Sequence, residues 1–121
     1  MKFVFDNNMP IYIQLVEQLK KQIIAGIIPP GSRLPSVRDL AAMTKVNPNT
    51  MQKALTYLEE LKLIYTERTN GKFVTNDKKL LDKFKEKYAI ELLKEYFTNM
   101  QSIGLDKKDA IKYINNMEDL K

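Results

Sequence analysis

The side chains best suited to recognition chemistry fall on one face of a predicted helix. Its outward positions are Asn49, Gln52, Lys53 and Thr56. Steps of three and four residues place such side chains next to one another on a helix. Asparagine and glutamine form paired hydrogen bonds with adenine, and lysine donates to guanine. The face therefore carries the groups that read base edges in a DNA major groove.

A polar helix face is, by itself, more often simply solvated. The elements around this helix decide between the two interpretations. Apolar residues recur at helical spacing over residues 10–25, and Gly26 ends that first predicted helix. A second, shorter helix is predicted from Pro35 to about Thr44.

The third predicted helix carries the polar face and runs from Asn47 to about Leu61. Asn47 is a good N-cap, and Pro48 suits the first helical position. Its apolar residues lie on the opposite side: Met51, Ala54, Leu55, Leu58 and Leu61. A short link over residues 44–47 joins the second and third helices. A tight turn between two short amphipathic helices predicts a helix-turn-helix, whose second helix enters the major groove.

Two β-prone runs, residues 63–68 and 72–75, follow the third helix. They flank Asn70-Gly71, and because both residue types tolerate positive φ, a β-hairpin is predicted. Three helices and then a hairpin is the order of a winged helix. We therefore predict a mainly α fold with a small β-hairpin, with a winged helix-turn-helix domain over residues 1–76.

The composition changes at Asp77 to a segment rich in Lys, Glu and Leu. A helix of about 22 residues is predicted there, and Gly104 interrupts it. Asp106 and Asp109 then form a capping-box pattern that begins a last short helix. Residues 77–121 are therefore predicted to form a short C-terminal helical hairpin.

Apolar side chains in this C-terminal segment form a stripe too broad for one small hairpin to bury. A second copy of the chain is the natural cover, which predicts a homodimer. The alternative is that the stripe packs only onto the chain's own winged helix. The residues assigned to dimerisation are Leu81, Phe84, Tyr88, Leu92, Leu93, Tyr96, Phe97, Met100, Ile111 and Ile114.

The overall composition argues against several classes of protein. The 121 residues include no cysteine and no histidine, which removes disulfides, thiolate metal sites and the commonest general base. Without metal-ligand spacing or a phosphate-binding glycine loop, we expect neither an enzyme nor a cofactor. No apolar run has the length of a membrane span, and the N-terminus lacks a secretory signal pattern, so we expect a cytoplasmic protein.

The charge distribution points to the first part of the chain. The net charge is +5, and +4 of it lies in residues 1–76. A basic balance favours nucleic acid or another anionic surface, although a lysine-rich soluble domain would show the same balance.

Several motifs occur in a consistent order and spacing over about residues 9–75. They are Pro10-Ile11-Tyr12-Ile13-Gln14-Leu15, Ile24-Ala25-Gly26, the run from Pro30 to Ala41, Val46-Asn47-Pro48-Asn49-Thr50, and Arg68 with Gly71-Lys72-Phe73-Val74. Together they resemble the GntR-type transcription regulators. The first and fourth motifs are most similar to the YtrA-like subgroup, whose members carry only a short helical C-terminal extension.

The resemblance implies DNA contacts from the second helix, the third helix and the hairpin, the last at the minor groove or the DNA backbone. The implied residues are Arg33, Ser36, Arg38, Asn47, Asn49, Thr50, Gln52, Lys53, Arg68, Asn70, Gly71 and Lys72. Two alternatives stay open. Arg38 could instead be an ion-pair partner of Asp39 or Glu59. Lys72 could be an edge-strand lysine that blocks aggregation.

We therefore expect a homodimeric repressor that binds a palindromic operator, and the resemblance implies transporter operons as its targets. Its partners would be double-stranded DNA and a second copy of the chain. No residue identifies a small-molecule effector, which would have to bind at the dimer interface or between the C-terminal segment and the winged helix. The competing interpretation is a winged-helix protein–protein adaptor without specific DNA binding.

The chain also departs from the family pattern. Lys62 stands where a glycine usually follows the third helix, and a left-handed backbone there would cost lysine roughly 1 kcal/mol. Thr69 replaces another common glycine in the wing. Pro48 and Gln52 stand where other subgroups use arginine, so an operator sequence does not carry over.

Overall fold

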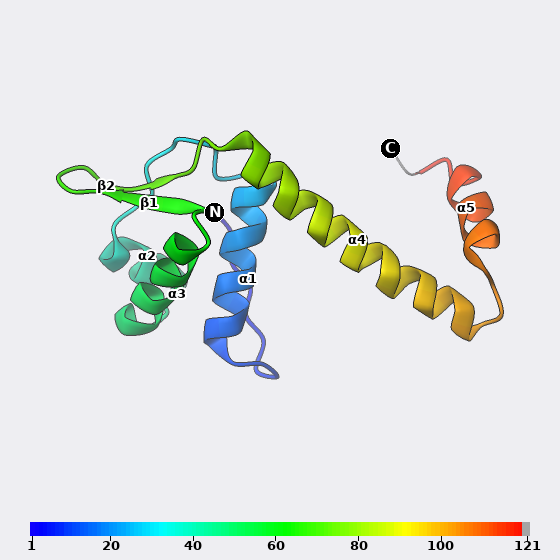
Figure 1. The fold of residues 1–121 in the computed structure, drawn as a ribbon. Coiled ribbons are helices and arrows are strands. Elements are labelled where there is room, and N and C mark those ends of the chain that lie inside the picture. The colour runs from blue at the N-terminus through cyan, green and yellow to red at the C-terminus, as the bar shows by residue number, and fades with distance from the viewer. Residues whose placement is uncertain (120–121) are drawn as a thin grey trace. The chain divides into compact units, whose positions relative to one another are not determined.

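The computed structural model describes residues 1–119 and follows the predicted order of elements (Figure 1). The elements are α1 (Ile11–Ile24), α2 (Val37–Thr44), α3 (Pro48–Glu60), β1 (Ile64–Glu67), β2 (Gly71–Val74), α4 (Lys78–Ser102) and α5 (Lys107–Asn115). The predicted mainly α fold with one antiparallel hairpin is confirmed. Backbone contacts divide the chain into one compact unit over residues 1–83 and another that begins at Phe84.

The core of the first unit lies where α3 packs against α1, α2 and β1. Its largest fully buried side chains are Leu15, Leu19, Ile23, Leu40, Met51, Leu55, Leu58, Leu63, Ile64 and Val74. Burying one such side chain is worth about 1.5–3 kcal/mol. These contacts hold α3 in one orientation, because any rotation about its axis would bring apolar side chains into water.

Helix α2 begins later than the sequence predicts. Ser36 is its N-cap, and the Ser36 Oγ accepts a hydrogen bond from the Asp39 N–H at 3.0 Å. A serine in this position satisfies a backbone donor that the first helical turn leaves without a partner. Pro35, the predicted start, therefore lies outside the helix, which begins at Val37.

The hairpin is confirmed, but its turn differs from the one that Asn70-Gly71 suggests. Glu67 pairs with Gly71, so residues 68–70 form a three-residue loop. Gly71 has a φ of 98°, whereas Asn70 is not among the residues with positive φ. A three-residue loop followed by a glycine is a common alternative to the two-residue turn.

The connection between α1 and α2 extends the hairpin on its β2 side. The Val74 N–H donates to the Ser32 carbonyl at 2.9 Å, and the Leu34 N–H donates to the Lys72 carbonyl at 2.8 Å. Arg33 forms an isolated bridge with Phe73 between these two bonds. The base of the hairpin is therefore attached to the segment that leads into α2.

The N-terminal segment runs along α1 and is held by glutamine side chains. The Val4 N–H donates to the Gln18 Oε1 at 2.9 Å, and the Gln18 Nε2 donates back to the Val4 carbonyl at 2.6 Å. Gln14 makes the same two-way pair with the backbone of Asp6, at 2.8 and 2.9 Å. Farther along α1, the Gln22 Nε2 donates to the carbonyl of residue 2 at 2.8 Å.

This pairing works because two periods match. Alternate residues of an extended chain are about 6.6 Å apart, and residues four apart on a helix are about 6 Å apart along its axis. Glutamines at every fourth helical position can therefore bond to every second residue of the extended segment. Phe3 and Phe5, the intervening residues, stack with ring centroids 6.3 Å apart.

Two lysines in the first unit have a left-handed backbone. Lys45, after α2, has a φ of 57°, and Lys62, after α3, has a φ of 65°. Lys62 therefore has the left-handed backbone that makes a lysine unfavourable at this position. A lysine in this conformation costs roughly 1 kcal/mol more than a glycine.

The second unit contains the rest of α4 together with α5. Helix α4 has 25 residues, slightly more than expected, and Gly104 follows it with a φ of 84°. The predicted capping box of Asp106 and Asp109 is present at the start of α5. Ala110 is fully buried in this unit. No helix in residues 1–119 is both long enough and apolar enough to cross a membrane.

We predict that Gln18→Ala loosens the N-terminal segment, because it removes both hydrogen bonds to Val4. Amide hydrogen exchange over residues 2–6 should become faster, and the free energy of unfolding should fall by about 1 kcal/mol or less. Gln101→Ala, at an exposed position on α4, is the control and should change neither. Unchanged exchange in the Gln18 variant would show that other contacts hold the segment.

Candidate nucleic-acid interface

Helix α3 begins with a cap that the sequence predicts correctly. The Asn47 Oδ1 accepts a hydrogen bond from the Asn49 N–H at 2.8 Å, and Pro48 occupies the first helical position. The carbonyl end of the Asn47 side chain is therefore used to start the helix. Its amide –NH₂ group has no hydrogen-bond partner among the described residues and is exposed.

The outer face of α3 is polar and exposed. It carries Asn49, Gln52, Lys53 and Thr56. The Gln52 Nε2 donates to the Thr56 Oγ1 at 3.2 Å, so these two side chains lie together one helical turn apart. The opposite face is fully buried, and its residues are Met51, Ala54, Leu55 and Leu58. The structure thus brings the predicted recognition residues of α3 to one exposed surface.

Polar residues of α2 lie near the start of that helix. The Ser36 Oγ is occupied by its own cap bond. Arg38 is exposed and, within residues 1–119, makes no ion pair. The alternative in which Arg38 pairs with Glu59 is not realised, because Lys72 takes that place.

Lys72 attaches the hairpin to the end of α3. Its ammonium group bonds to the Glu59 carboxylate and also donates to the Thr66 Oγ1 at 3.0 Å. The Thr66 hydroxyl in turn donates to the Glu59 Oε1 at 2.7 Å. Only 18% of the Lys72 side chain is exposed. Lys72 therefore holds the hairpin against α3. The sequence carries no local sign of this role, because Glu59 is 13 residues away.

The same cluster changes the acidity of Glu59. Burial by itself would raise the pKa of this carboxyl group, but the hydrogen bonds from Lys72 and Thr66, with the positive charge of Lys72, outweigh it. The pKa of Glu59 is therefore lowered from its ordinary value of 4.5. The ionised form of Glu59 is the one that stabilises the fold.

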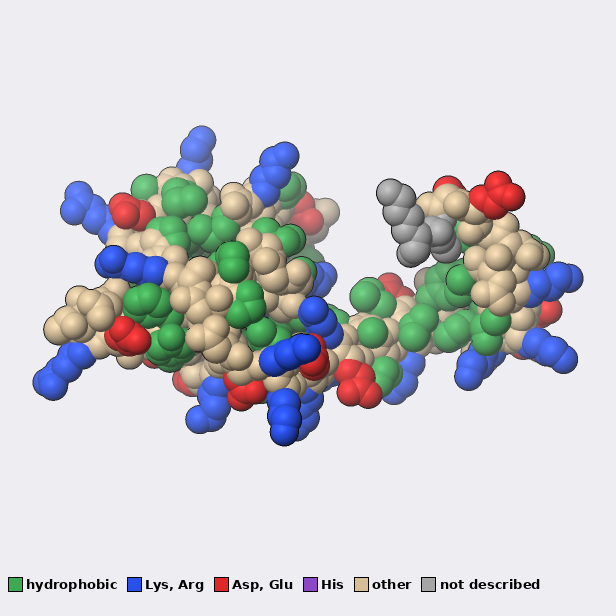
Figure 2. All heavy atoms as spheres, turned by 90° about the horizontal axis from the view of Figure 1, so that it is seen from above, with side chains coloured by type: hydrophobic (Ala, Val, Ile, Leu, Met, Phe, Trp, Pro, Cys, Tyr) green, Lys and Arg blue, Asp and Glu red, His purple; other side chains and the backbone are tan. Residues whose placement is uncertain are grey.

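A groove of about 300 Å³ separates the start of α2 from the hairpin. Arg33, Arg68 and Lys72 are among its lining residues. A Cβ added at Gly71 would lie 3.3 Å from the Arg33 Nε, so the absence of a side chain lets the guanidinium approach the hairpin. Figure 2 shows Lys and Arg side chains projecting from this unit, including around the end where the hairpin lies.

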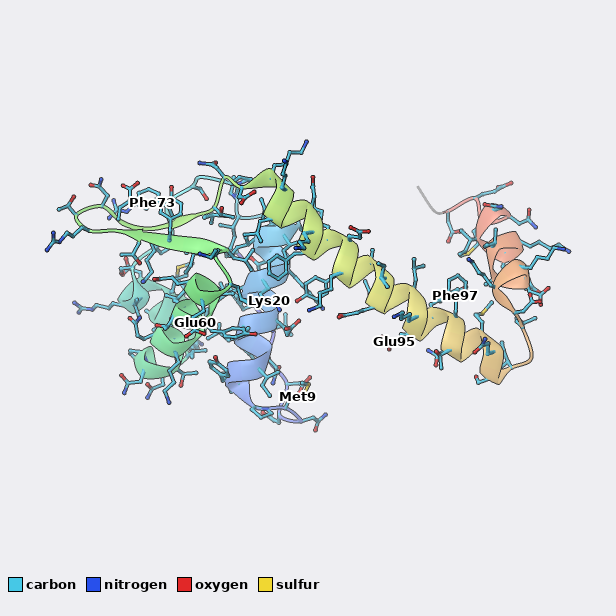
Figure 3. The ribbon with its side chains drawn as sticks, viewed as in Figure 1. Met9, Lys20, Glu60, Phe73, Glu95 and Phe97 are labelled. Atoms are coloured by element: carbon cyan, nitrogen blue, oxygen red, sulfur yellow. The ribbon has the colours of Figure 1, made fainter. Side chains whose placement is uncertain are left out.

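The hairpin is stiffened by aromatic packing. Tyr65 and Phe73 face each other across the two strands with ring centroids 5.7 Å apart. Figure 3 labels Phe73 on the hairpin. At its tip, the Asn70 Nδ2 donates to the Glu67 Oε2 at 3.1 Å. Arg68 and Asn70 are both exposed there.

Comparison with known proteins identifies the architecture. A family model described as bacterial regulatory proteins of the gntR family matches residues 11–74. The chain belongs to the GntR family. It is 34% identical over 110 residues to the uncharacterised HTH-type transcriptional regulator YhcF of Bacillus subtilis, covering 91% of each chain. It is also 34% identical over 112 residues to the HTH-type transcriptional repressor YtrA of Bacillus subtilis, covering 92% of this chain and 86% of YtrA.

A solved structure gives the same result. The chain is similar to a GntR family transcriptional regulator from Listeria monocytogenes, with 36% identity and a TM-score of 0.84 over 94% of this chain and all of that one. This GntR-family chain is therefore a DNA-binding transcriptional regulator and not an enzyme. Its candidate DNA-binding surface consists of the start of α2, the exposed face of α3 and the hairpin.

We predict that Glu59→Gln lowers the free energy of unfolding by about 0.5–1 kcal/mol at pH 7, because Lys72 loses a partly exposed ionic partner. Since the folded-state pKa of Glu59 is below 4.5, the wild-type advantage should persist above that pH and disappear as the pH falls through the lowered pKa. Denaturant unfolding at several pH values measures it. Glu60→Gln, at the next and exposed position, is the control. A difference that does not change with pH would contradict the assignment.

Proposed function

We propose that this GntR-family regulator is a homodimeric repressor that binds a palindromic operator with α3 in the major groove. The observation that carries the proposal is the division of α3 into a fully buried apolar face and an exposed polar face. The buried face prevents rotation, so the same side chains are always presented outward. No acidic residue precedes Glu59 on α3, so nothing on its first turns would repel phosphate.

Each part of the proposed interface has a different task. Asn49, Gln52 and Lys53 have the donors and acceptors for base edges, and Thr56 lies beside them. Arg38 and Thr50 would contact phosphates, Asn47 would supply its amide group at the start of α3, and Ser36 would hold the start of α2. Such contacts position a protein on DNA without reading its sequence.

The hairpin is proposed to lie along the adjacent minor groove or backbone. Arg33, Arg68 and Asn70 would supply its polar contacts, with Gly71 allowing close approach. Lys72 contributes mainly by holding the hairpin in place, because its ammonium group is engaged by Glu59. The first domain is proposed to span residues 1–76, followed by the dimerisation segment over residues 77–121.

The C-terminal segment supports the proposal of a dimer through its exposed apolar surface. Leu92 is 62% exposed and Ile103 is 70% exposed. Leu93, Tyr96 and Ile111 are also exposed, and the partly exposed members are Phe84, Tyr88, Phe97, Met100 and Ile114 (Figure 3 labels Phe97). Leu81 differs, because it is buried in the first unit and has little surface left for a partner. We propose that a second copy of the chain buries this apolar surface, since helix-turn-helix proteins read two half-sites with two-fold symmetry.

Similarity to other members of the family supports the proposals that the protein represses transcription and that it acts on particular targets. YtrA carries the name of a repressor, and we propose repression here for the same reason. Transporter operons are the proposed targets, on family resemblance. A winged-helix protein–protein adaptor without specific DNA binding is the competing function, and it would not depend on the exposed polar face of α3.

The first experiment selects DNA from a pool of random-sequence duplexes and titrates the selected duplex at two salt concentrations. An inverted repeat bound by two chains, with affinity falling steeply as salt rises, is expected. Simultaneous Arg38→Glu and Lys53→Glu should weaken binding by about 100-fold or more. Lys2→Glu with Lys21→Glu changes the charge equally outside the proposed interface and is the control. Binding that is sequence-blind and unaffected by the first pair would favour the adaptor.

A second experiment tests the dimer. Leu92→Glu with Leu93→Glu puts charges on the exposed apolar surface and should convert a dimer into monomers in sedimentation measurements. Operator affinity should fall by roughly 10–100-fold, because the two half-sites are no longer linked. Lys94→Glu with Glu95→Lys alters the neighbouring exposed positions without changing net charge or apolar surface, and should leave the dimer intact. A variant at Leu92 and Leu93 that remains dimeric would place the interface elsewhere.

A further inference from the structure

Within residues 1–119, only Lys45 and Lys62 combine a side chain with a positive φ. Glycine or asparagine is the usual occupant of such a position after a helix. A lysine is energetically unfavourable at such a position. Its presence there therefore suggests an interaction that compensates for this cost. Both lysines gain something from the helix they follow, because a cation near a helix C-terminus is worth about 0.3–1 kcal/mol. That gain applies equally to both, so it does not distinguish them.

The surroundings of Lys45 leave its charge available. Its backbone is fixed, because it caps α2 through an N–H donated to the Ala41 carbonyl, and its neighbours Thr44 and Val46 are buried. Its side chain is exposed and makes no ion pair within the described residues. The sequence contains no acidic residue from Leu40 to Leu58. A rigid turn therefore presents an unneutralised ammonium group to solvent.

The position of that turn relative to α3 suggests which interaction compensates for the unfavourable backbone conformation of Lys45. Lys45 stands two residues before Asn47, the N-cap of α3. A helix that enters the major groove has a phosphate backbone on each side of it, about 12 Å apart. The chain that leads into the helix must pass close to one of these backbones. Lys62 lies at the other end of α3, between that helix and β1.

We infer that Lys45 binds a DNA phosphate beside the groove that α3 enters. This inference rests on the proposed docking of α3 and adds a contact that the family motifs do not assign. The left-handed backbone directs a cation outward from a turn in which both neighbouring side chains are buried. Lys62, with the same backbone and the same charge, has no such contact.

The test compares Lys45→Gly with Lys62→Gly, each of which removes one positive charge and one unfavourable φ. Both variants should unfold at the wild-type temperature or above it. Lys45→Gly should weaken binding of both the selected duplex and a random-sequence duplex by about tenfold per dimer. It should also reduce the slope of log affinity against log salt by about 0.9 for each chain. Lys62→Gly should change neither affinity nor slope, and Lys45→Arg should retain both.

The outcomes separate the contact from the function on which it rests. A Lys45→Gly protein with wild-type affinity and salt slope would overturn the phosphate contact and leave Lys45 as a helix cap. Weaker binding to the selected duplex alone would also overturn it, because a phosphate contact is indifferent to sequence. A wild-type protein that shows no salt-dependent binding would overturn the docking of α3 itself.

Discussion

The buried face of α3 is the constraint on which the rest of this structure depends. Four side chains of that face, Met51, Ala54, Leu55 and Leu58, are fully inaccessible to solvent. Because α1, α2 and β1 all pack against α3, turning the helix would disrupt the core of the whole unit. The polar face is thus oriented by apolar contacts that themselves bind nothing. A rigid recognition surface loses little conformational entropy when DNA binds.

The other parts of the proposed surface are attached to α3 or to its neighbours. Glu59, at the end of α3, holds the hairpin through Lys72 and Thr66. The hairpin in turn holds residues 32–34, which lead into α2. The segment that leads into α2, the end of α3 and the hairpin are therefore linked by polar contacts over a shared core. A change at Glu59 would alter the proposed DNA-binding surface by moving the hairpin, without removing any group proposed to contact DNA.

The two units carry their apolar residues in different ways. The first buries a core of large apolar side chains between its helices and hairpin, although others, such as Ile27 and Met43, remain exposed. The second exposes Leu92 and Leu93 on α4 and Ile103 just after that helix. In the proposed dimer, the first unit would supply the surface for DNA and the second the surface for the partner chain. The N-terminal segment belongs to the first unit and is bound by the glutamines of α1.

The sequence by itself determined the order of the elements and the caps of α3 and α5, because those depend on neighbouring residues. Asn47-Pro48 marked the start of α3, Asp106 with Asp109 marked α5, and β-prone runs around Gly71 marked the hairpin. Only the tertiary structure decided which distant groups meet. The pairing of Glu59 with Lys72 joins residues 13 positions apart, and that of Gln18 with Val4 joins residues 14 positions apart. The burial of Leu81 likewise depends on the packing of the first unit. No local pattern encodes such contacts, since they exist only once the core has placed the elements against one another.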